Sequence, residues 1–226
     1  MPTILLVRHA QASFGSADYD VLSPVGHGKT QLLAAAIAGR DLNVTHVAAG
    51  SARRQLDTAA PLAAERGLEV EVDPRWNEYE TEEVLEHHGE APVSLAGAGG
   101  AGEEVSSRQF QAVLDGALAS WVASREGTTA AQSWPHFLES REQALAELAA
   151  TLGRGETALV FTSGGVIAAL GGHLLGGHPD LFPTLNRVLV NTGVTKLAVG
   201  RAGTSLISFN EHAHIDDGGG KLLTYR

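Results

Sequence analysis

The 226-residue sequence contains no cysteine, which excludes disulfide bonds, zinc sites with cysteine ligands and thiol catalysis. Lysine and arginine number only 16 against 26 acidic residues, and the net charge of −10 disfavours binding to nucleic acid or to an anionic membrane. No apolar run approaches the roughly 20 residues of a membrane span, and no basic segment precedes the first apolar run as in a secretory signal. We therefore expect a cytoplasmic protein. The sequence carries no signal for an oligomeric state.

Hydrophobic residues make up 43% of the chain and fall into runs of two kinds. Strand-like runs occur at residues 3–7, 44–48, 157–161, 187–190 and 204–209. Helix-like segments lie between them, at residues 24–39, 53–66, 105–125, 135–152 and 164–175. Strands that alternate with helices predict an α/β fold in three layers, α/β/α, with a mostly parallel central sheet covered on both faces.

One region interrupts this alternation. The acidic segment EYETEEVLEHHGE begins at residue 78 and predicts a helix, and the Gly/Ala-rich segment LAGAGGAGEE that follows it predicts a loop. We interpret residues of about 78–135 as a small helical and loop cap, inserted into a single domain that spans residues 1–226.

Polar segments follow three of the expected strands. Arg8 and His9 end the first, GSARRQ (residues 50–55) follows the second, and FTSGG (residues 161–165) opens a helix. The carboxyl ends of parallel strands bind ligands at one edge of the sheet. Arginine forks and a helix N-terminus suit phosphate, and a histidine beside them can accept a phosphoryl group. Taken singly, an Arg-His pair is usually a surface feature and Ser-Gly-Gly is often a cap and turn.

Five segments in order carry a family resemblance that covers most of the chain. They are LLVRHAQ (residues 5–11), YDVLSPVG (19–26), GSARRQLDTA (50–59), RWNEYE (75–80) and FTSGGVIAAL (161–170). With these segments the sequence resembles the histidine phosphatase superfamily, in its phosphoglycerate mutase-like branch. The resemblance implies a phosphoglycerate mutase-like fold and hydrolysis of a small phosphate monoester, without a metal or another cofactor.

The same resemblance assigns roles to individual residues. It makes His9 the nucleophile that becomes phosphohistidine, and Arg8 and Arg54 the clamp on the phosphoryl oxygens. Arg53 is the neighbouring candidate, but the distance from Arg54 to the Thr-Ala pair fits the motif better. Glu78 would protonate the leaving oxygen and then activate water. Without the motif, Glu78 would be interpreted as a solvated residue of an acidic helix.

Departures from the family pattern affect the expected function. The family usually has His-Gly-Gly in its last motif, where this chain has Ser163 before Gly164. We expect Ser163 and Gly164 to bind phosphate, with one positive charge fewer than in the family. Ala12 and Gly15 stand where mutases usually have a hydroxyl residue and an asparagine. A phosphatase is therefore favoured over two alternatives, a mutase-type phosphotransferase and a phosphate-binding module with weakened catalysis.

Further histidines allow two interpretations each. His87 and His88 are either exposed residues of the acidic helix or donors that replace the missing histidine. The segment EHAHIDD (residues 211–217) suggests a metal site through His212, His214 and Asp216. Ligands this close on one irregular segment rarely complete a metal site, so a loop near the mouth of the pocket is the preferred interpretation.

Overall fold

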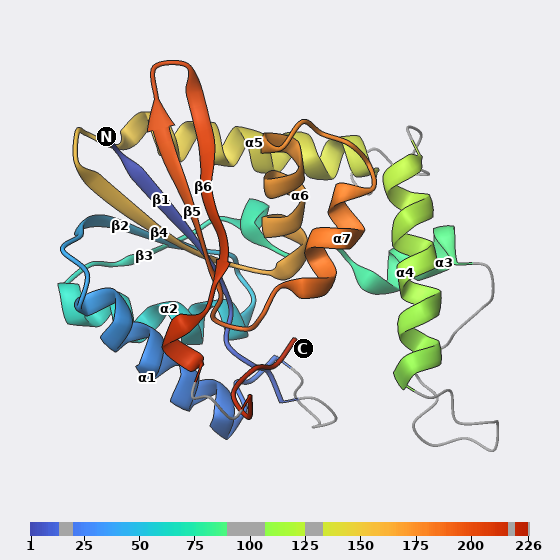
Figure 1. Cartoon of the computed structure of the whole chain (residues 1–226), viewed down its shortest axis with the longest axis horizontal. Coiled ribbons are helices and arrows are strands. Elements are labelled where there is room, and N and C mark those ends of the chain that lie inside the picture. The colour runs from blue at the N-terminus through green and yellow to red at the C-terminus, as the bar shows by residue number, and fades with distance from the viewer. Residues whose placement is uncertain (14–19, 90–106, 125–132, 217–219, 226) are drawn as a thin grey trace.

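The computed structural model describes residues 1–13, 20–89, 107–124, 133–216 and 220–225. A six-stranded sheet lies at its centre, in the order β3-β2-β4-β1-β5-β6 (Figure 1). The strands are Thr3–Arg8 (β1), Asn43–Ala49 (β2), Val70–Val72 (β3), Glu156–Thr162 (β4), Val194–Gly200 (β5) and Gly203–Glu211 (β6). The first four strands in this order are parallel, and β5 is antiparallel to both of its neighbours.

Helices lie on both sides of the sheet. They are Pro24–Ala38 (α1), Arg53–Arg66 (α2), Thr81–His88 (α3), Ser107–Ala123 (α4), Trp134–Thr151 (α5), Gly164–Leu174 (α6) and Leu181–Val188 (α7), with short 3-10 turns at Pro74–Trp76 (η1) and Ala213–Ile215 (η3). The α/β fold with a mostly parallel sheet is confirmed. No helix in the described ranges is long and apolar enough to cross a bilayer.

The first strand shows how the sequence builds these layers. Successive side chains of a strand point to opposite faces of the sheet. Leu5 and Val7 therefore join the core under α1 and α2, whereas Ile4 and Leu6 join the core under α5 and α6. All four side chains are buried. A strand that is covered on both faces reads as a continuous apolar run, which is why residues 3–7 do not alternate with polar residues.

One predicted strand is wrong. Residues 187–190 are the end of α7 and the irregular segment that follows it. The apolar run VLV is too short for its pattern to separate a buried strand from a helix end. The strand in this part of the chain is β5, which the sequence analysis did not identify.

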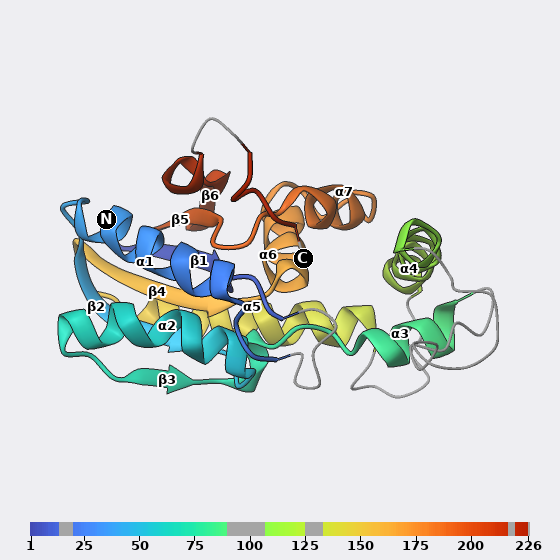
Figure 2. The same ribbon diagram turned by 90° about the horizontal axis from the view of Figure 1, so that it is seen from below.

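The geometry of the sheet brings the predicted functional segments to one edge. Arg8 lies opposite Thr162 in the parallel pairing of β1 with β4, so both strands finish at the same level. In both views α3 and α4 lie beyond this end of the sheet (Figures 1 and 2). The acidic segment after residue 78 does form the helix α3. The predicted Gly/Ala-rich loop at residues 95–104 lies outside the described residues.

The contact between α1 and the sheet gives a test of this core. Leu33 is fully buried under the sheet, whereas Leu32 on the same helix is 40% exposed. We expect Leu33→Ala to lower the free energy of unfolding by about 2–5 kcal/mol because it leaves a cavity. The matched variant Leu32→Ala should change it by about 0.5 kcal/mol or less. Urea unfolding followed by circular dichroism measures both, and equal losses would contradict the packing described.

Candidate active site

His9 directly follows β1, and its backbone N–H donates a 2.8 Å hydrogen bond to the carbonyl oxygen of Thr162. The residue is buried, with 7% of its surface exposed. Its Nδ1 lies 2.8 Å from the carbonyl oxygen of Ala10. Because a carbonyl oxygen only accepts, Nδ1 carries the proton and the lone pair of the imidazole is on Nε2.

The environment keeps this imidazole neutral. Burial lowers the pKa of His9 well below 6.5, and the positive charges of Arg8 and Arg54 lower it further. The hydrogen bond to Ala10 acts in the opposite direction but is the smallest influence. A neutral histidine with its lone pair on Nε2 is the form that can attack phosphorus.

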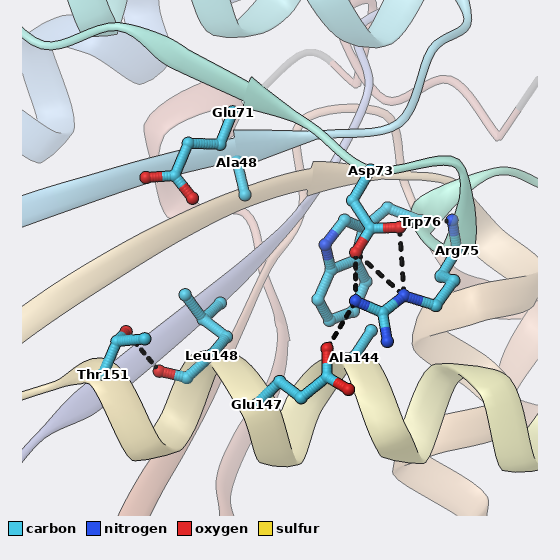
Figure 3. Close-up of a pocket in the computed structure, with 9 residues that line it drawn as sticks. All are labelled: Ala48, Glu71, Asp73, Arg75, Trp76, Ala144, Glu147, Leu148 and Thr151. Carbon is cyan, nitrogen blue, oxygen red and sulfur yellow. Dashed lines mark hydrogen bonds and ion pairs between the residues drawn. The ribbon is translucent and has the colours of Figure 1, made fainter.

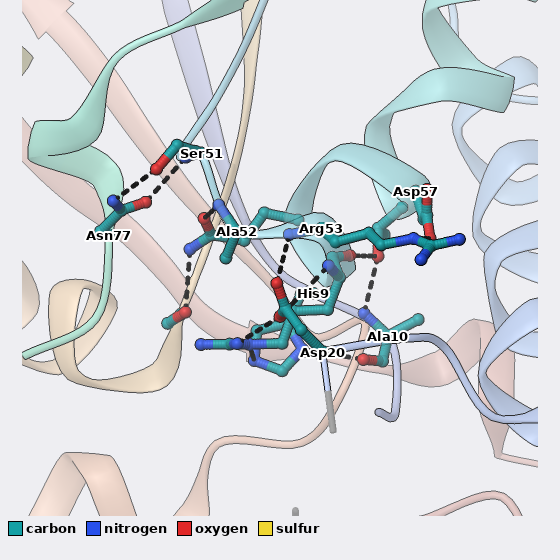
Figure 4. A network of polar contacts seen from close by, with 12 residues as sticks. His9, Ala10, Asp20, Ser51, Ala52, Arg53, Asp57 and Asn77 are labelled. Atoms are coloured by element: carbon teal, nitrogen blue, oxygen red, sulfur yellow. Dashed lines mark hydrogen bonds and ion pairs between the residues drawn. The ribbon is translucent and has the colours of Figure 1, made fainter. Parts of the chain in front are cut away.

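Arg54 lies against the reactive nitrogen. Its Nε donates a hydrogen bond to His9 Nε2 over 3.3 Å, and its Nη1 pairs with Asp20 Oδ1 at 2.5 Å. Asp20 also accepts the backbone N–H of Arg53 at 2.6 Å, so it holds the start of α2 (Figure 4). The side chain of Arg53 faces Asp57 at 3.5 Å instead. The structure therefore brings Arg54 rather than Arg53 to the histidine.

Arg8 approaches from the end of β1. Its Nη1 donates a 2.5 Å hydrogen bond to the carbonyl oxygen of Leu189, which orients the guanidinium. The group lies beside Gly164, where a Cβ atom would be 3.6 Å from Arg8 Nε. Arg8 and the start of α6 are thus neighbours, as the convergence of strand ends predicts.

Ser163 is completely buried at the end of β4. Its hydroxyl makes no capping bond to α6, although a cap was one expectation for it. Instead, Ser163 Oγ accepts a 2.9 Å hydrogen bond from Gln55 Nε2, and the same amide group donates to the carbonyl oxygen of Trp76 at 3.1 Å. Because a hydroxyl can accept and donate at once, this arrangement leaves the Ser163 proton to be donated elsewhere.

Glu78 places its carboxyl at the N-terminus of α6. Its Oε2 accepts the backbone N–H of Gly165 at 3.1 Å, and its Oε1 accepts that of Tyr79 at 3.3 Å. Loss of hydration raises the pKa of Glu78 above 4.5, although the Gly165 N–H and the charges of Arg54 and Arg8 oppose this. A raised pKa keeps a carboxyl protonated to higher pH, as a general acid requires.

The residue before Glu78 is fixed from two sides. The carbonyl oxygen of Asn77 accepts a hydrogen bond from Arg141 Nη2 at 2.9 Å. The Asn77 side chain accepts the Ser51 N–H at 2.7 Å and donates to Ser51 Oγ at 2.8 Å (Figure 4). These bonds tie Glu78 to the segment that leads into α2 and therefore to Arg54.

The other four histidines considered in the sequence analysis do not join this site. His87 is exposed at the end of α3, and His88 Nδ1 is 3.4 Å from Ser120 Oγ on α4. His212 donates to the carbonyl oxygen of Asn210, and His214 contacts Thr192. Within the described ranges, no three His, Cys, Asp or Glu side chains gather as metal ligands.

A hollow on the surface lies away from these residues, between η1, the β2–β3 edge and α5 (Figure 3). Its arginine, Arg75, pairs with Asp73 at 2.7 Å and with Glu147 at 2.6 Å. Glu71 adds a third carboxylate to the lining. Two carboxylates neutralise the one cation, so the hollow has no positive charge to offer a phosphate.

A family model matches most of the chain. A model of the histidine phosphatase superfamily, branch 1, matches residues 4–130 and 97–212. The chain belongs to the histidine phosphatase superfamily. The family prediction made from the five motifs is confirmed. No curated protein sequence matches the chain.

Solved structures share the fold at low sequence identity. A mycobacterial glucosyl-3-phosphoglycerate phosphatase is 21% identical with a TM-score of 0.65, over 93% of this chain and 99% of that one. A phosphoserine phosphatase variant from Entamoeba histolytica, in complex with phosphoserine, is 20% identical with a TM-score of 0.61, over 95% and 100% of the two chains. The YhfR protein of Bacillus stearothermophilus is 17% identical with a TM-score of 0.65, over 96% and 100%.

Sequence reasoning missed several residues that support the site. Asp20 and Gln55 lie inside the quoted motifs, but the motifs alone do not say which partner each polar side chain meets. Asn191, whose Nδ2 donates to the backbone oxygen of His9 at 3.1 Å, follows the segment that was wrongly predicted as a strand. Its role depends on contacts between distant parts of the chain, which local patterns do not encode.

The close approach of Glu78 to α6 gives a second test. A Cβ on Gly165 would lie 2.1 Å from Glu78 Oε1 and 2.6 Å from the Tyr79 ring. We expect Gly165→Ala to displace the carboxyl and to lower kcat for an alkyl phosphate by about 10- to 100-fold. Gly28→Ala, at an open position of α1, is the control and should keep full activity. Unchanged activity of Gly165→Ala would show that Glu78 does not act from this position.

Proposed function

We propose that this protein hydrolyses small phosphate monoesters through a phosphohistidine intermediate on His9. The neutral imidazole, with its Nε2 lone pair next to the Arg54 guanidinium, carries this proposal. A phosphoryl group bound to Arg54 would lie beside the nucleophile. Two of these neighbours, the glucosyl-3-phosphoglycerate phosphatase and the phosphoserine phosphatase, are named for small phosphorylated molecules, which supports the same substrate class. A cytoplasmic location is part of the proposal.

In the first step, His9 Nε2 forms a bond to phosphorus while the bond to the leaving oxygen breaks. Arg8 and Arg54 bind the phosphoryl oxygens, where negative charge is concentrated. Glu78 gives its proton to the leaving oxygen, so the product departs as an alcohol. The Nδ1–H bond to Ala10 holds the ring and accommodates the positive charge that develops on it.

In the second step, water attacks phosphorus and the bond to His9 breaks. Glu78 is now a carboxylate and takes one proton from the attacking water. Phosphate leaves, His9 is again neutral, and Glu78 is again protonated. The two steps use the same four side chains and need no redox partner.

Ser163 takes the place of a charged group in this scheme. We propose that its hydroxyl, oriented by Gln55, donates a hydrogen bond to a phosphoryl oxygen beside Gly164. A neutral hydrogen bond contributes about 1 kcal/mol, whereas one from a charged group contributes about 1.5–3 kcal/mol. The site therefore keeps part of the interaction that a histidine would supply.

We further propose that α3 and α4 form a cap on a single domain and contact the variable part of the substrate. The Trp121 ring of α4 lies 5.4 Å from the ring of Tyr79, the residue after Glu78. It also lies 5.2 Å from the ring of Phe137 on α5. Arg187 of α7 pairs with Asp115 of α4 at 3.2 Å. These contacts support a fixed position of the cap beside the catalytic residues.

The covalent intermediate can be trapped. After acid-free denaturing quench of a reaction with a ³²P-labelled monoester, we expect acid-labile label on His9. His9→Gln should show none, and the control His87→Gln, at an exposed position, should be labelled normally. Label elsewhere, or turnover without label, would contradict the proposal. Return of the label to another position of the substrate would indicate a mutase. Binding of the monoester with neither label on the protein nor turnover would indicate a binding module.

The acid role of Glu78 predicts a dependence on the leaving group. Glu78→Gln should slow alkyl phosphates by about 100-fold or more, and p-nitrophenyl phosphate much less, because nitrophenolate leaves without a proton. Since the pKa of Glu78 is raised, wild-type activity on alkyl phosphates should fall as pH rises through that pKa. The lowered pKa of His9 keeps the nucleophile neutral below pH 6.5, so activity should persist there. Equal slowing of both substrates would count against proton donation.

A further inference from the structure

A chain of hydrogen bonds runs from a buried lysine to the backbone of the nucleophile. Lys29 Nζ on α1 donates to Thr224 Oγ1 at 2.5 Å, and Thr224 Oγ1 donates to Asn191 Oδ1 at 2.8 Å. Asn191 Nδ2 donates to the carbonyl oxygen of His9 at 3.1 Å. Residues from three segments far apart in the sequence thus form one hydrogen-bond chain that ends at His9.

The burial of these groups shows that the contacts are not incidental. Lys29 and Asn191 have no exposed surface. Among the described residues, no carboxylate lies within ion-pair distance of the Lys29 ammonium, and its hydrogen-bond partner is the hydroxyl of Thr224. Burying an ammonium group without a carboxylate is costly. The proposed mechanism makes no direct use of this lysine.

The direction of each hydrogen bond follows from the charge at the far end. An ammonium group only donates, so Thr224 must accept from Lys29 and turns its own proton toward Asn191. Asn191 then presents its oxygen to Thr224 and its NH₂ group to His9. A neutral amine can also accept, which would let Thr224 turn its proton toward Lys29. Asn191 Oδ1 would then lose the donor that holds it, while its NH₂ group still faces His9 because a carbonyl oxygen only accepts.

The loop that carries Asn191 also holds the backbone on both sides of Arg8. The Thr192 N–H donates to the carbonyl oxygen of Arg8 at 3.0 Å, and the Arg8 N–H donates to Gly193 at 3.1 Å. Thr192 has a φ of 66°, a left-handed conformation that favours glycine. A loop in this conformation needs contacts from outside to keep it. The backbone N–H of Asn191 supplies a second one, because it donates to the carbonyl oxygen of Thr224 at 2.9 Å.

We propose that Asn191 is a positioning residue for His9, and that Thr224 and the protonated form of Lys29 hold the Asn191 side chain in place. This inference rests on the proposed function, because positioning is observed through the phosphorylation of His9. The C-terminal segment thereby becomes part of the active site without contacting the substrate.

Titration of Lys29 gives the proposal a measurable signature. Burial, and then the charge of Arg8 on β1, lower the pKa of Lys29 to about 8. Lys29 in turn faces His214 of η3. Burial, and then the charges of Arg40, His212 and Lys29, lower the pKa of His214 to about 4, so His214 stays neutral above that pH. As pH rises through 8, Lys29 loses its proton and the hydrogen-bond chain loses its fixed direction.

The experiment compares kcat for p-nitrophenyl phosphate between pH 7 and pH 9, which brackets the pKa of Lys29. We expect kcat of wild type to fall by about threefold or more over this range relative to kcat of Lys29→Gln, whose side chain does not titrate. Both proteins keep Glu78, so the ratio of their rates cancels its titration. Lys196→Gln, which removes a lysine from β5, is the control and should follow wild type. Identical profiles for wild type and Lys29→Gln would overturn the proposal.

Substitution of Thr224 tests the link itself. Thr224→Val should lower kcat by about three- to tenfold with KM changed less than about twofold, and Thr224→Ser should restore the wild-type value. Thermal unfolding of each variant establishes that it is folded. Wild-type kcat in folded Thr224→Val, or loss without rescue by serine, would overturn the positioning role.

A readout without catalysis separates this inference from the proposed function. If wild type releases no phosphate from any monoester, the proposed function fails, and the ¹³C resonance of the His9 carbonyl decides the inference. That resonance should shift between pH 7 and pH 9 in wild type but not in Lys29→Gln. A resonance that stays constant in both proteins would overturn it.

Discussion

The hydrogen bond from His9 Nδ1 to the carbonyl oxygen of Ala10 is the contact on which the rest of the site depends. It assigns the proton to one ring nitrogen and the lone pair to the other. Burial and two flanking arginines then lower the pKa of the ring and keep it neutral. If either condition changed, Arg54 would face a protonated nitrogen and the imidazole would repel the cations that must stand beside it.

The charge balance of the site follows from that requirement. Arg8 and Arg54 supply two positive charges, and Asp20 neutralises one of them. Glu78, which is protonated at the start of the proposed mechanism, adds none. With Ser163 in place of a second histidine, the positive excess is small. In the proposed mechanism, this small excess would hold a dianionic phosphoryl group without binding it so tightly that inorganic phosphate cannot leave. A small excess also lowers the electrostatic cost of packing the cations together.

The sequence predicted the parts of this molecule that depend on local pattern. Continuous apolar runs marked β1 and β4, and motif order identified the family together with His9, Arg8, Arg54 and Glu78, which the fold brings to one edge. The segment after residue 180 was misread because a short apolar run fits a helix end as well as a strand. The hydrogen-bond partners of Asp20, Gln55 and Lys29 could not be predicted for a different reason. Each is set by chain segments that meet only after folding, and a hydrogen bond between distant residues leaves no trace in the spacing of either.

The order of the strands has a consequence for how the chain is made. β1 is synthesised first, yet it pairs with β4 and β5, whose residues come about 150 or more positions later. At a synthesis rate of about 5–20 residues per second, its apolar run waits roughly 8–30 seconds for a partner. During that time an unpaired ILLV segment is exposed to other nascent chains. The centre of the sheet is therefore built from the apolar segment that waits longest for its partners, and that segment is open to aggregation during translation.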